Sequence, residues 1–164
     1  MQFEEVYDRY FDRIYNYIRY RVFARDAADD LVSEVFEKVL DKFDSFDPAV
    51  APLEPWLYAI ARNTLTDYFR RRATRGTLSI TEREENISSG ESVEGAALKG
   101  EENARLLAAV SQLSDAEREL IAMKFSLGLN NREIAAQTGL GESNVGVTLF
   151  RAMGKLRDKL GKDI

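Results

Sequence analysis

The chain has 164 residues, of which 45% are hydrophobic and 31% are charged, and its net charge is −5. This length suits one ordinary domain or two small ones, and the apolar content is sufficient for a core, which argues against a disordered chain. Cysteine and histidine are both absent, which excludes disulfides, Cys/His zinc sites and nucleophile–base pairs that need either residue.

No apolar run approaches the ~20 residues that a membrane-spanning helix needs. The N-terminal sequence MQFEEVYDRY is charged from its fourth residue, unlike a secretory signal. We therefore expect a cytoplasmic protein without membrane insertion. Phosphate-binding loops and the motifs GxGxxG and GxSxG are also missing. Together with the missing Cys and His, this argues against an enzyme, although carboxylate chemistry is left open. We expect no catalytic residue and no metal site.

The charge is unevenly distributed. Residues 1–72 hold 11 basic and 14 acidic side chains, residues 73–103 hold 3 and 7, and residues 104–164 hold 9 and 7. Only the last segment is net basic. Because neutralisation of phosphates supplies most non-specific affinity for DNA, we expect the isolated chain to bind bare DNA poorly.

Two amphipathic helices are predicted at the start of the chain. The first covers residues 3–22, and the second covers about 27–43 with Asp26 as its N-cap. Carboxylates occupy the face of the second helix that lies opposite its apolar stripe. The positions expected to be buried are Phe3, Tyr7, Tyr10, Phe11, Ile14, Tyr15, Ile18 and Val22, and then Leu31, Val32, Val35, Phe36, Val39, Leu40 and Phe43.

The segment 44–55 contains all three prolines of the chain and is predicted to be a loop. A helix should follow over about 55–72, with Pro55 in its first turn. Its buried side is expected to hold Leu57, Ala61, Thr64, Leu65 and Tyr68, while Ala59, Asn63, Thr66 and Arg70 face outward, flanked by Trp56, Arg62 and Asp67.

Residues 73–103 are dominated by Gly, Ser, Thr and Glu and are predicted to be a flexible acidic linker. A helix begins again at 104–113, and Ser114 with Glu117 forms a capping box for the next one. The chain is therefore predicted to be all-α, with two small helical domains, 1–72 and 104–164, joined by this linker.

A second capping box, Asn130 with Glu133, opens a short helix that Gly139 closes, and a longer helix follows over about 142–160. This order is the plan of a helix-turn-helix, in which Ile134, Ala135, Leu140, Val145 and Leu149 pack the two helices together. The second helix would present Ser143, Asn144, Val147, Thr148 and Arg151 to base edges, with Lys155 further along. An αα-hairpin within a bundle, without DNA binding, remains the alternative.

An indole, a side-chain amide and several arginines lie on or near one outward helix face in the sequence WLYAIARNTLTDYFRRR at 56–72. Arginine suits phosphates, asparagine can pair with base edges, and tryptophan can stack on an unpaired base. An amphipathic helix with a half-buried Trp and solvated arginines explains the same pattern equally well.

Three motifs in order resemble the bacterial sigma-70 superfamily, in particular its extracytoplasmic-function (ECF) RNA polymerase sigma factors, which keep only regions 2 and 4. They are DAADDLVSEVFEKVL at 26–40, WLYAIARNTLTDYFRRR at 56–72, and LSDAERELIAMKF followed by NNREIAAQTGLGESNVGVTLFRAMGKLR. The resemblance covers nearly the whole chain except the linker. It implies a dissociable subunit that directs promoter-specific transcription initiation, with region 2 in 1–72 and region 4 in 104–164.

In such factors the acidic helix of region 2 binds the clamp helices of the polymerase β′ subunit, and the β flap is a further contact. A row of carboxylates agrees with this, since it suits a basic partner surface and has little use on DNA. A solvated helix face is the alternative. The residues that match are Asp29, Asp30, Leu31, Glu34 and Glu37.

The outward face of the helix at 55–72 resembles the surface that opens the −10 element. Asn63 matches a residue expected to contact an exposed base. Trp56 matches the family's tryptophan and is expected to be largely a packing residue, while Phe46 in the loop 44–55 is the best candidate for stacking on a flipped base. The DNA backbone or neighbouring bases would be held by Arg62, Thr66, Asp67, Arg70 and Arg71.

The last helix would read the −35 element, but here the chain departs from the family. Gly146 and Thr148 stand where relatives usually carry Lys and Arg. Gly146 also weakens the helix by roughly 1 kcal/mol relative to alanine. We therefore expect −35 recognition that is weak or dependent on the holoenzyme, with Arg151 and Lys155 meeting phosphates.

The partners that the resemblance implies are core RNA polymerase, which performs the chemistry, and promoter DNA. In the assembled enzyme the two modules are expected to be held apart at promoter spacing. An anti-sigma factor that covers both modules is a common inhibitor in the family, and a flexible linker would permit that closed arrangement. Two other functions fit the residues alone: a dimeric helix-turn-helix regulator, and a helical protein that sequesters a basic partner. An enzyme fits least well.

Overall fold

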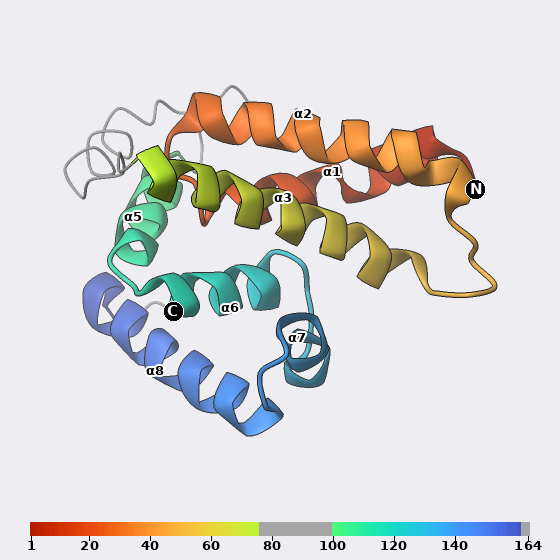
Figure 1. Cartoon of the computed structure of the whole chain (residues 1–164). Helices are drawn as coiled ribbons and strands as arrows, with labels where there is room; N and C mark the ends of the chain where they lie inside the picture. The colour runs from red at the N-terminus through yellow and green to blue at the C-terminus, as the bar shows by residue number, and fades with distance from the viewer. Residues whose placement is uncertain (76–99, 162–164) are drawn as a thin grey trace.

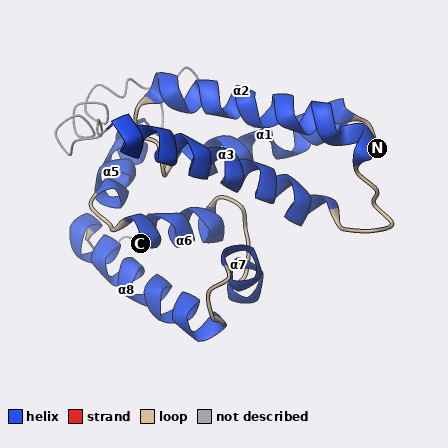
Figure 2. Cartoon of the chain, viewed as in Figure 1, coloured by secondary structure: helices blue, strands red, loops and turns tan. Residues whose placement is uncertain are grey.

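The computed structural model describes residues 1–75 and 100–161, and every regular element within these ranges is a helix (Figure 1, Figure 2). This confirms the predicted all-α fold. Residues 76–99, the greater part of the linker predicted over 73–103, lie outside the described residues.

The N-terminal module consists of α1 (Phe3–Arg19), α2 (Arg25–Lys42), the short 3-10 helix η1 (Phe43–Ser45) and α3 (Leu53–Arg75). The three long helices each contact the other two and lie side by side in Figure 1. Their buried residues recur every three or four positions, as expected for helices that each turn one apolar face inward. The core includes Val6, Ile14, Tyr17 and Ile18 of α1, Ala28, Val35 and Val39 of α2, and Leu57, Ala61 and Leu65 of α3.

The predicted apolar stripes are correct along their centres and wrong at their edges. Tyr7 and Leu40 were expected in the core, but they are 40% and 54% exposed. Val6 and Tyr17 are fully buried, although neither belongs to the predicted stripe. The apolar face of α1 is wider than the surface that α2 and α3 cover, and helical periodicity alone does not show which edge remains outside.

The start of α2 also differs from the prediction. Its N-cap is Ala24, which has an extended backbone, so the assignment of Asp26 as N-cap is wrong. Asp26 instead lies in the first turn of the helix. A carboxylate there still stabilises the helix through the positive end of its dipole.

The segment predicted as a loop over 44–55 contains the end of η1 and the first turn of α3. Helix α3 begins at Leu53 and continues to Arg75, and is therefore longer at both ends than 55–72. Pro55 is accommodated because the first N–H groups of a helix have no intrahelical partner.

The C-terminal module consists of α5 (Gly100–Ser111), α6 (Asp115–Phe125), α7 (Asn131–Thr138) and α8 (Glu142–Leu160), and α8 packs on the other three. Both predicted capping boxes are present, Ser114 with Glu117 and Asn130 with Glu133. Gly139 ends α7 in the left-handed conformation, with φ +80°. The core of this module includes Val110, Leu113, Leu120, Ile121, Ile134, Val145, Leu149, Ala152 and Leu156.

The turn of the helix-turn-helix differs from the prediction at one residue. Leu140 was expected to pack α7 against α8, but its side chain is exposed. Ala135 is half-buried, and Ile134 and Val145 are fully buried. The two helices are therefore joined by the residues on either side of the turn.

The two modules pack against each other through α1 and α6. Buried Arg118 of α6 lies over the ring of Phe23, its guanidinium carbon 5.8 Å from the ring centroid. The same guanidinium donates to the carbonyl of Ser111 at 3.2 Å, which connects the end of α5 to this contact. The buried hydrophobic residues of both modules thus belong to one cluster.

The Ser114 cap gives a direct test of this fold. Ser114→Ala removes the acceptor for the backbone N–H of Glu117 and should lower the free energy of unfolding by about 1 kcal/mol, measured by chemical denaturation. Ser33→Ala, at an exposed position inside α2, is the matched control and should change stability by less than about 0.5 kcal/mol. An equal loss in both variants would contradict the capping role.

Candidate interaction surfaces

A row of carboxylates lies along the exposed side of α2, as the sequence predicts. Lys38 does not neutralise it fully, because its ammonium is shared. The ammonium nitrogen lies 3.0 Å from Glu34 Oε2 and also donates to Thr64 Oγ1 of α3 at 3.1 Å. Of the predicted acidic positions, Asp29, Asp30 and Glu37 are exposed and Glu34 is half-buried.

Leu31, the fifth residue predicted for this surface, is only 3% exposed and packs in the core. It therefore does not reach the surface of α2 in this structure. Its role here is to anchor α2 against the other helices, which keeps the carboxylates on the outside.

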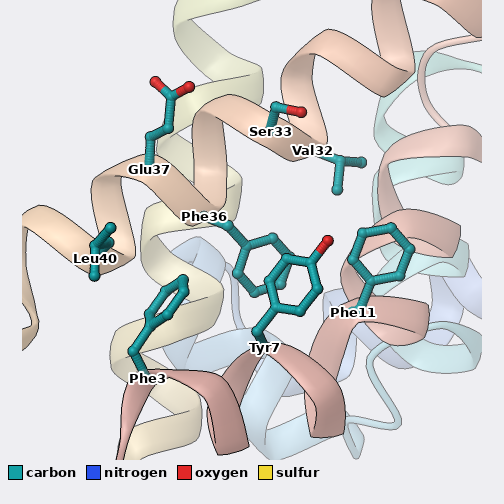
Figure 3. A pocket seen from close by; sticks show the side chains of 8 residues that line it. All are labelled: Phe3, Tyr7, Phe11, Val32, Ser33, Phe36, Glu37 and Leu40. Atoms are coloured by element: carbon teal, nitrogen blue, oxygen red, sulfur yellow. The ribbon is translucent and has the colours of Figure 1, made fainter.

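An aromatic groove lies beside the acidic face, between α1 and α2 (Figure 3). Its volume is about 240 Å³. The rings of Tyr7 and Phe36 meet edge to face with centroids 4.8 Å apart, and Glu37 lies at the rim with its carboxylate turned outward. The lining residues are Phe3, Tyr7, Phe11, Val32, Ser33, Phe36, Glu37 and Leu40. This groove was not predicted from the sequence, although the aromatic residues at four-residue steps along α1 were its signal.

Phe46 and Trp56 face each other at the start of α3. Their ring centroids are 4.6 Å apart with an interplanar angle of 33°, and both residues are half-buried. The packing expected of Trp56 is therefore present. Phe46, predicted to stack on a flipped base, packs against Trp56 in this structure with the two rings tilted.

The outward face of α3 carries an exposed polar strip formed by Asn63, Thr66, Arg70 and Arg71. Thr66 Oγ1 donates to the carbonyl of Arg62 at 3.0 Å, and Arg70 pairs with Asp67 at 3.3 Å. These local contacts hold part of the strip in place while Asn63 remains open to solvent. Arg62, also predicted for this face, is half-buried because its guanidinium is turned toward the C-terminal module.

Glu119 of α6 holds Arg62 and a second arginine of the N-terminal module. Its Oε1 lies 3.3 Å from Arg62 Nε, and its Oε2 lies 3.4 Å from Arg21 Nη1. Arg62 Nη1 also donates to the carbonyl of Gln137 at 3.1 Å, and Gln137 Nε2 donates to the carbonyl of Pro55 at 3.1 Å. Neither Glu119 nor Arg21 was predicted from the sequence, since no local pattern connects residues so far apart in the chain.

The residues predicted for the outward face of α8 differ in how exposed they are. Ser143, Asn144, Val147 and Arg151 are exposed, and half-buried Thr148 donates through Oγ1 to Asn144 Oδ1 at 3.2 Å. Phe150 is 82% exposed on the same helix and was not predicted. At Gly146, a Cβ atom would meet only Asn131 Nδ2 at 3.6 Å, so lack of space does not explain the glycine.

Lys155, predicted to contact a phosphate, is paired within the module. Its Nζ lies 2.9 Å from Oε2 and 3.1 Å from Oε1 of Glu117 on α6. Burial by itself would raise the pKa of Glu117, but hydrogen bonds from the Ser114 backbone N–H and from Lys155 outweigh it and hold that pKa below its ordinary value. Lys155 therefore stabilises the ionised form of a buried carboxylate.

Within residues 1–75 and 100–161, no group of Asp and Glu is arranged to hold a metal ion. In the same part of the chain, no helix is both long enough and apolar enough to cross a membrane.

Comparison with known protein families matches both modules. The model of sigma-70 region 2 matches residues 6–75, and the model of sigma-70 region 4 matches residues 103–156. The chain belongs to the sigma-70 family. The two matches cover the two helical modules and leave out the linker, so the helix-turn-helix of α7 and α8 is the DNA-binding unit of region 4. The sigma factor acts in promoter-specific transcription initiation.

Similar curated proteins include several ECF RNA polymerase sigma factors. BldN of Streptomyces coelicolor is 32% identical over 161 residues, which are 98% of this chain and 61% of that protein. SigM of Bacillus subtilis is 28% identical, and the match covers 96% of this chain and 94% of that protein. CnrH of Cupriavidus metallidurans, named an RNA polymerase sigma factor, is 30% identical over 82% of this chain and 74% of its own length. The sigma factor therefore falls in the ECF group.

Solved structures support the same fold. The sigma factor RpoE from Bartonella quintana, solved with the anti-sigma factor NepR, matches with a TM-score of 0.77 and 22% identity over 99% of this chain and 98% of that one. CnrH, solved with the cytosolic domain of CnrY, matches with a TM-score of 0.65 and 25% identity over 99% of this chain and 89% of that one.

The lowered pKa of Glu117 predicts a pH dependence of stability. A depressed carboxylate pKa contributes stability that is present above the unfolded pKa, about 4.3, and is lost as the pH falls through the folded value. Lys155→Gln should therefore destabilise the protein by roughly 1 kcal/mol at pH 7, and this difference should shrink below about pH 4. Urea denaturation at several pH values measures it.

Lys159→Gln is the matched control, because this exposed lysine on the same helix hydrogen-bonds a neutral glutamine, Gln112. Its effect should not change between pH 7 and about pH 2, a range that includes the loss expected for Lys155→Gln. A constant effect of Lys155→Gln over the same range would contradict the coupling to Glu117.

Proposed function

We propose that this ECF sigma factor divides its tasks among three surfaces. The acidic face of α2 binds core RNA polymerase at the clamp helices of β′, with the β flap as a further contact. The outward face of α3 captures the unpaired −10 element, and the outward face of α8 contacts the −35 element. The single observation that carries the proposal is the exposure of carboxylates on α2 and of an amide and arginines on α3, on helices whose other sides are buried together.

Binding of α2 to the polymerase is supported by its charge and by the neighbouring groove. Asp29, Asp30 and Glu37 are exposed to solvent. The lysines of α2 are fewer than its carboxylates, so the face keeps a net negative charge. A basic partner helix would neutralise these carboxylates and gain affinity from electrostatic complementarity. The aromatic groove between α1 and α2 adds apolar area beside the charges. Apolar and aromatic surface is typical of the centre of an interface, and charged residues are typical of its rim.

Opening of the −10 element is assigned to the polar strip of α3. Asn63 has an exposed amide that can pair with the edge of an unstacked base, and Arg70 and Arg71 are exposed beside it for the backbone. Phe46 reaches a base only if it leaves the ring of Trp56, so base capture requires the loop before α3 to rearrange.

Recognition of the −35 element is assigned to α8, with Ser143, Asn144 and Val147 toward base edges and Arg151 toward a phosphate. Thr148 braces Asn144, and Lys155 reaches DNA only by leaving Glu117. The small number of free cations on this face supports −35 binding that depends on the assembled holoenzyme.

The polymerase supplies the chemistry, so the sigma factor needs no catalytic residue and no cofactor. RpoE is solved with an anti-sigma factor, and CnrH is solved with the cytosolic domain of CnrY. By analogy, we propose that a protein inhibitor of this kind binds the present chain across both modules.

The decisive experiment is to reconstitute the full chain with core RNA polymerase and select, from random duplexes, those that support specific initiation. Enrichment of two conserved elements at −35 and −10 spacing is expected. A palindrome bound by the chain without polymerase would instead support a dimeric regulator. Absence of any selected sequence, with no binding to core polymerase, would refute the proposal.

Charge reversal on α2 tests the polymerase surface. Asp30→Lys with Glu34→Lys should weaken binding to core polymerase at least tenfold, because close like charges at an interface cost more than ~1.4 kcal/mol. Titration of labelled chain with core enzyme measures the change. Asp12→Lys, at an exposed site on α1, is the control and should retain binding. Unchanged affinity of the double variant would remove α2 from the interface.

Removal of the Arg151 charge tests the placement of α8. Arg151→Gln should weaken holoenzyme binding to all promoters about equally and reduce the slope of log affinity against log salt by about 1, since a phosphate contact carries no sequence information. Arg9→Gln, on the exposed side of α1, should leave the slope unchanged. A promoter-dependent effect of Arg151→Gln would indicate a base contact rather than a phosphate contact.

A further inference from the structure

Glu119 occupies a site built by the other module. Arg21 stands between α1 and α2, Arg62 belongs to α3, and the two guanidinium groups approach the two oxygens of one carboxylate, at 3.4 and 3.3 Å. Two arginines converging on one small anion is the arrangement that proteins also use for phosphates, because the guanidinium fork fits carboxylate and phosphate oxygens alike.

Arg21 has a further contact within its own module, and Arg62 is partly buried. The guanidinium carbon of Arg21 lies 5.0 Å from the ring centroid of Phe69, and only 10% of the Arg21 side chain is exposed. The side chain of Arg62 is 28% exposed. Two cations that converge on one carboxylate repel each other when that carboxylate withdraws, so binding of a replacement anion is favoured there.

The site borders the surface assigned to promoter DNA. Arg62 directly precedes Asn63 on α3, and Asn63, Thr66 and Arg70 remain exposed while α6 and α7 cover Arg62. The hydrogen bond from Gln137 to the carbonyl of Pro55 closes the same boundary near the start of α3. The C-terminal module thus blocks one side of the polar strip and leaves the remainder open.

We propose that Arg21 and Arg62 form an anion site with two alternative occupants: Glu119 in the closed chain, and a backbone phosphate of promoter DNA in the open chain. Glu119 is then an internal competitor of DNA, and Arg21 is a phosphate-binding residue. This inference rests on the proposed function, because it extends the −10 surface of α3. Separation of the modules on core polymerase breaks the Glu119 contacts and makes the site available where the promoter is opened.

The first test measures closure of the free chain. The absence of cysteine allows Ser33→Cys and Ser143→Cys, at exposed positions of the two modules, to be labelled with a fluorescent donor and acceptor. Glu119→Gln and Arg21→Gln should each lower the energy transfer, because each breaks the ion pair between modules. Glu5→Gln, an exposed carboxylate of α1, should leave the transfer unchanged. Unchanged transfer in both Glu119→Gln and Arg21→Gln would overturn the role of the Glu119 ion pairs in holding the chain closed.

The second test measures anion binding with a single-stranded thymidine 20-mer, followed by fluorescence anisotropy over a range of salt concentrations. Glu119→Gln should bind the oligonucleotide several-fold more tightly than the unmodified chain. Arg21→Gln, although equally open, should show no gain. Adding Arg21→Gln to Glu119→Gln should abolish the gain and reduce the salt slope by about 0.7, the value for one phosphate of a single strand. An undiminished slope would overturn the assignment of Arg21.

Two further measurements keep the test decisive. If thermal melting shows that Glu119→Gln is unfolded, Gln137→Ala takes its place; it removes the bond to Pro55 and should give partial opening and a smaller gain. In transcription with core polymerase, Arg21→Gln should lower promoter opening, and normal opening would overturn this inference alone. Failure of the unmodified chain to support any promoter-specific transcription would instead overturn the proposed function.

Discussion

The packing of α2 against α3 decides which side chains the N-terminal module offers to its partners. Thr64 is fully buried between the two helices, where its hydroxyl donates to the carbonyl of Ile60 at 2.8 Å and accepts from Lys38 at 3.1 Å. Together with fully buried Leu57 and Leu65, this contact determines the rotation of both helices about their axes. The carboxylates of α2 and the polar strip of α3 therefore face outward as a consequence of the core.

The boundary between the modules uses groups that also suit nucleic acid. A carboxylate and a phosphate present similar oxygens to arginine, so Glu119 can fill a site that DNA would otherwise fill. Because both arginines are partly removed from water, their pairing with Glu119 is screened less than a surface ion pair would be. We expect a chain with net charge −5 that covers one of its own cation sites to have little affinity for free DNA, as the proposed action through the polymerase requires.

Helix α8 likewise has few basic side chains that are free to contact DNA. Lys155 stabilises buried Glu117, while Val147 and Phe150 give the exposed face an apolar character. Space for a side chain exists at Gly146, so the absence of a cation there is a property of the sequence and not a requirement of packing. We therefore expect region 4 of this chain to make few phosphate contacts, and to need region 2 and the polymerase for stable placement on a promoter.

The sequence by itself determined the helices, both capping boxes, the order of the helix-turn-helix and the polar face of α3, because each depends on residues within a few positions of one another. It failed where a wide apolar face had to be divided into buried and exposed parts, as at Tyr7 and Leu40. It also failed for the aromatic groove and for the Glu119 site. Arg62 and Glu119 are 57 positions apart, and only the packing of α6 against α1 brings such residues within reach, because long-range pairs leave no periodic signal in the chain.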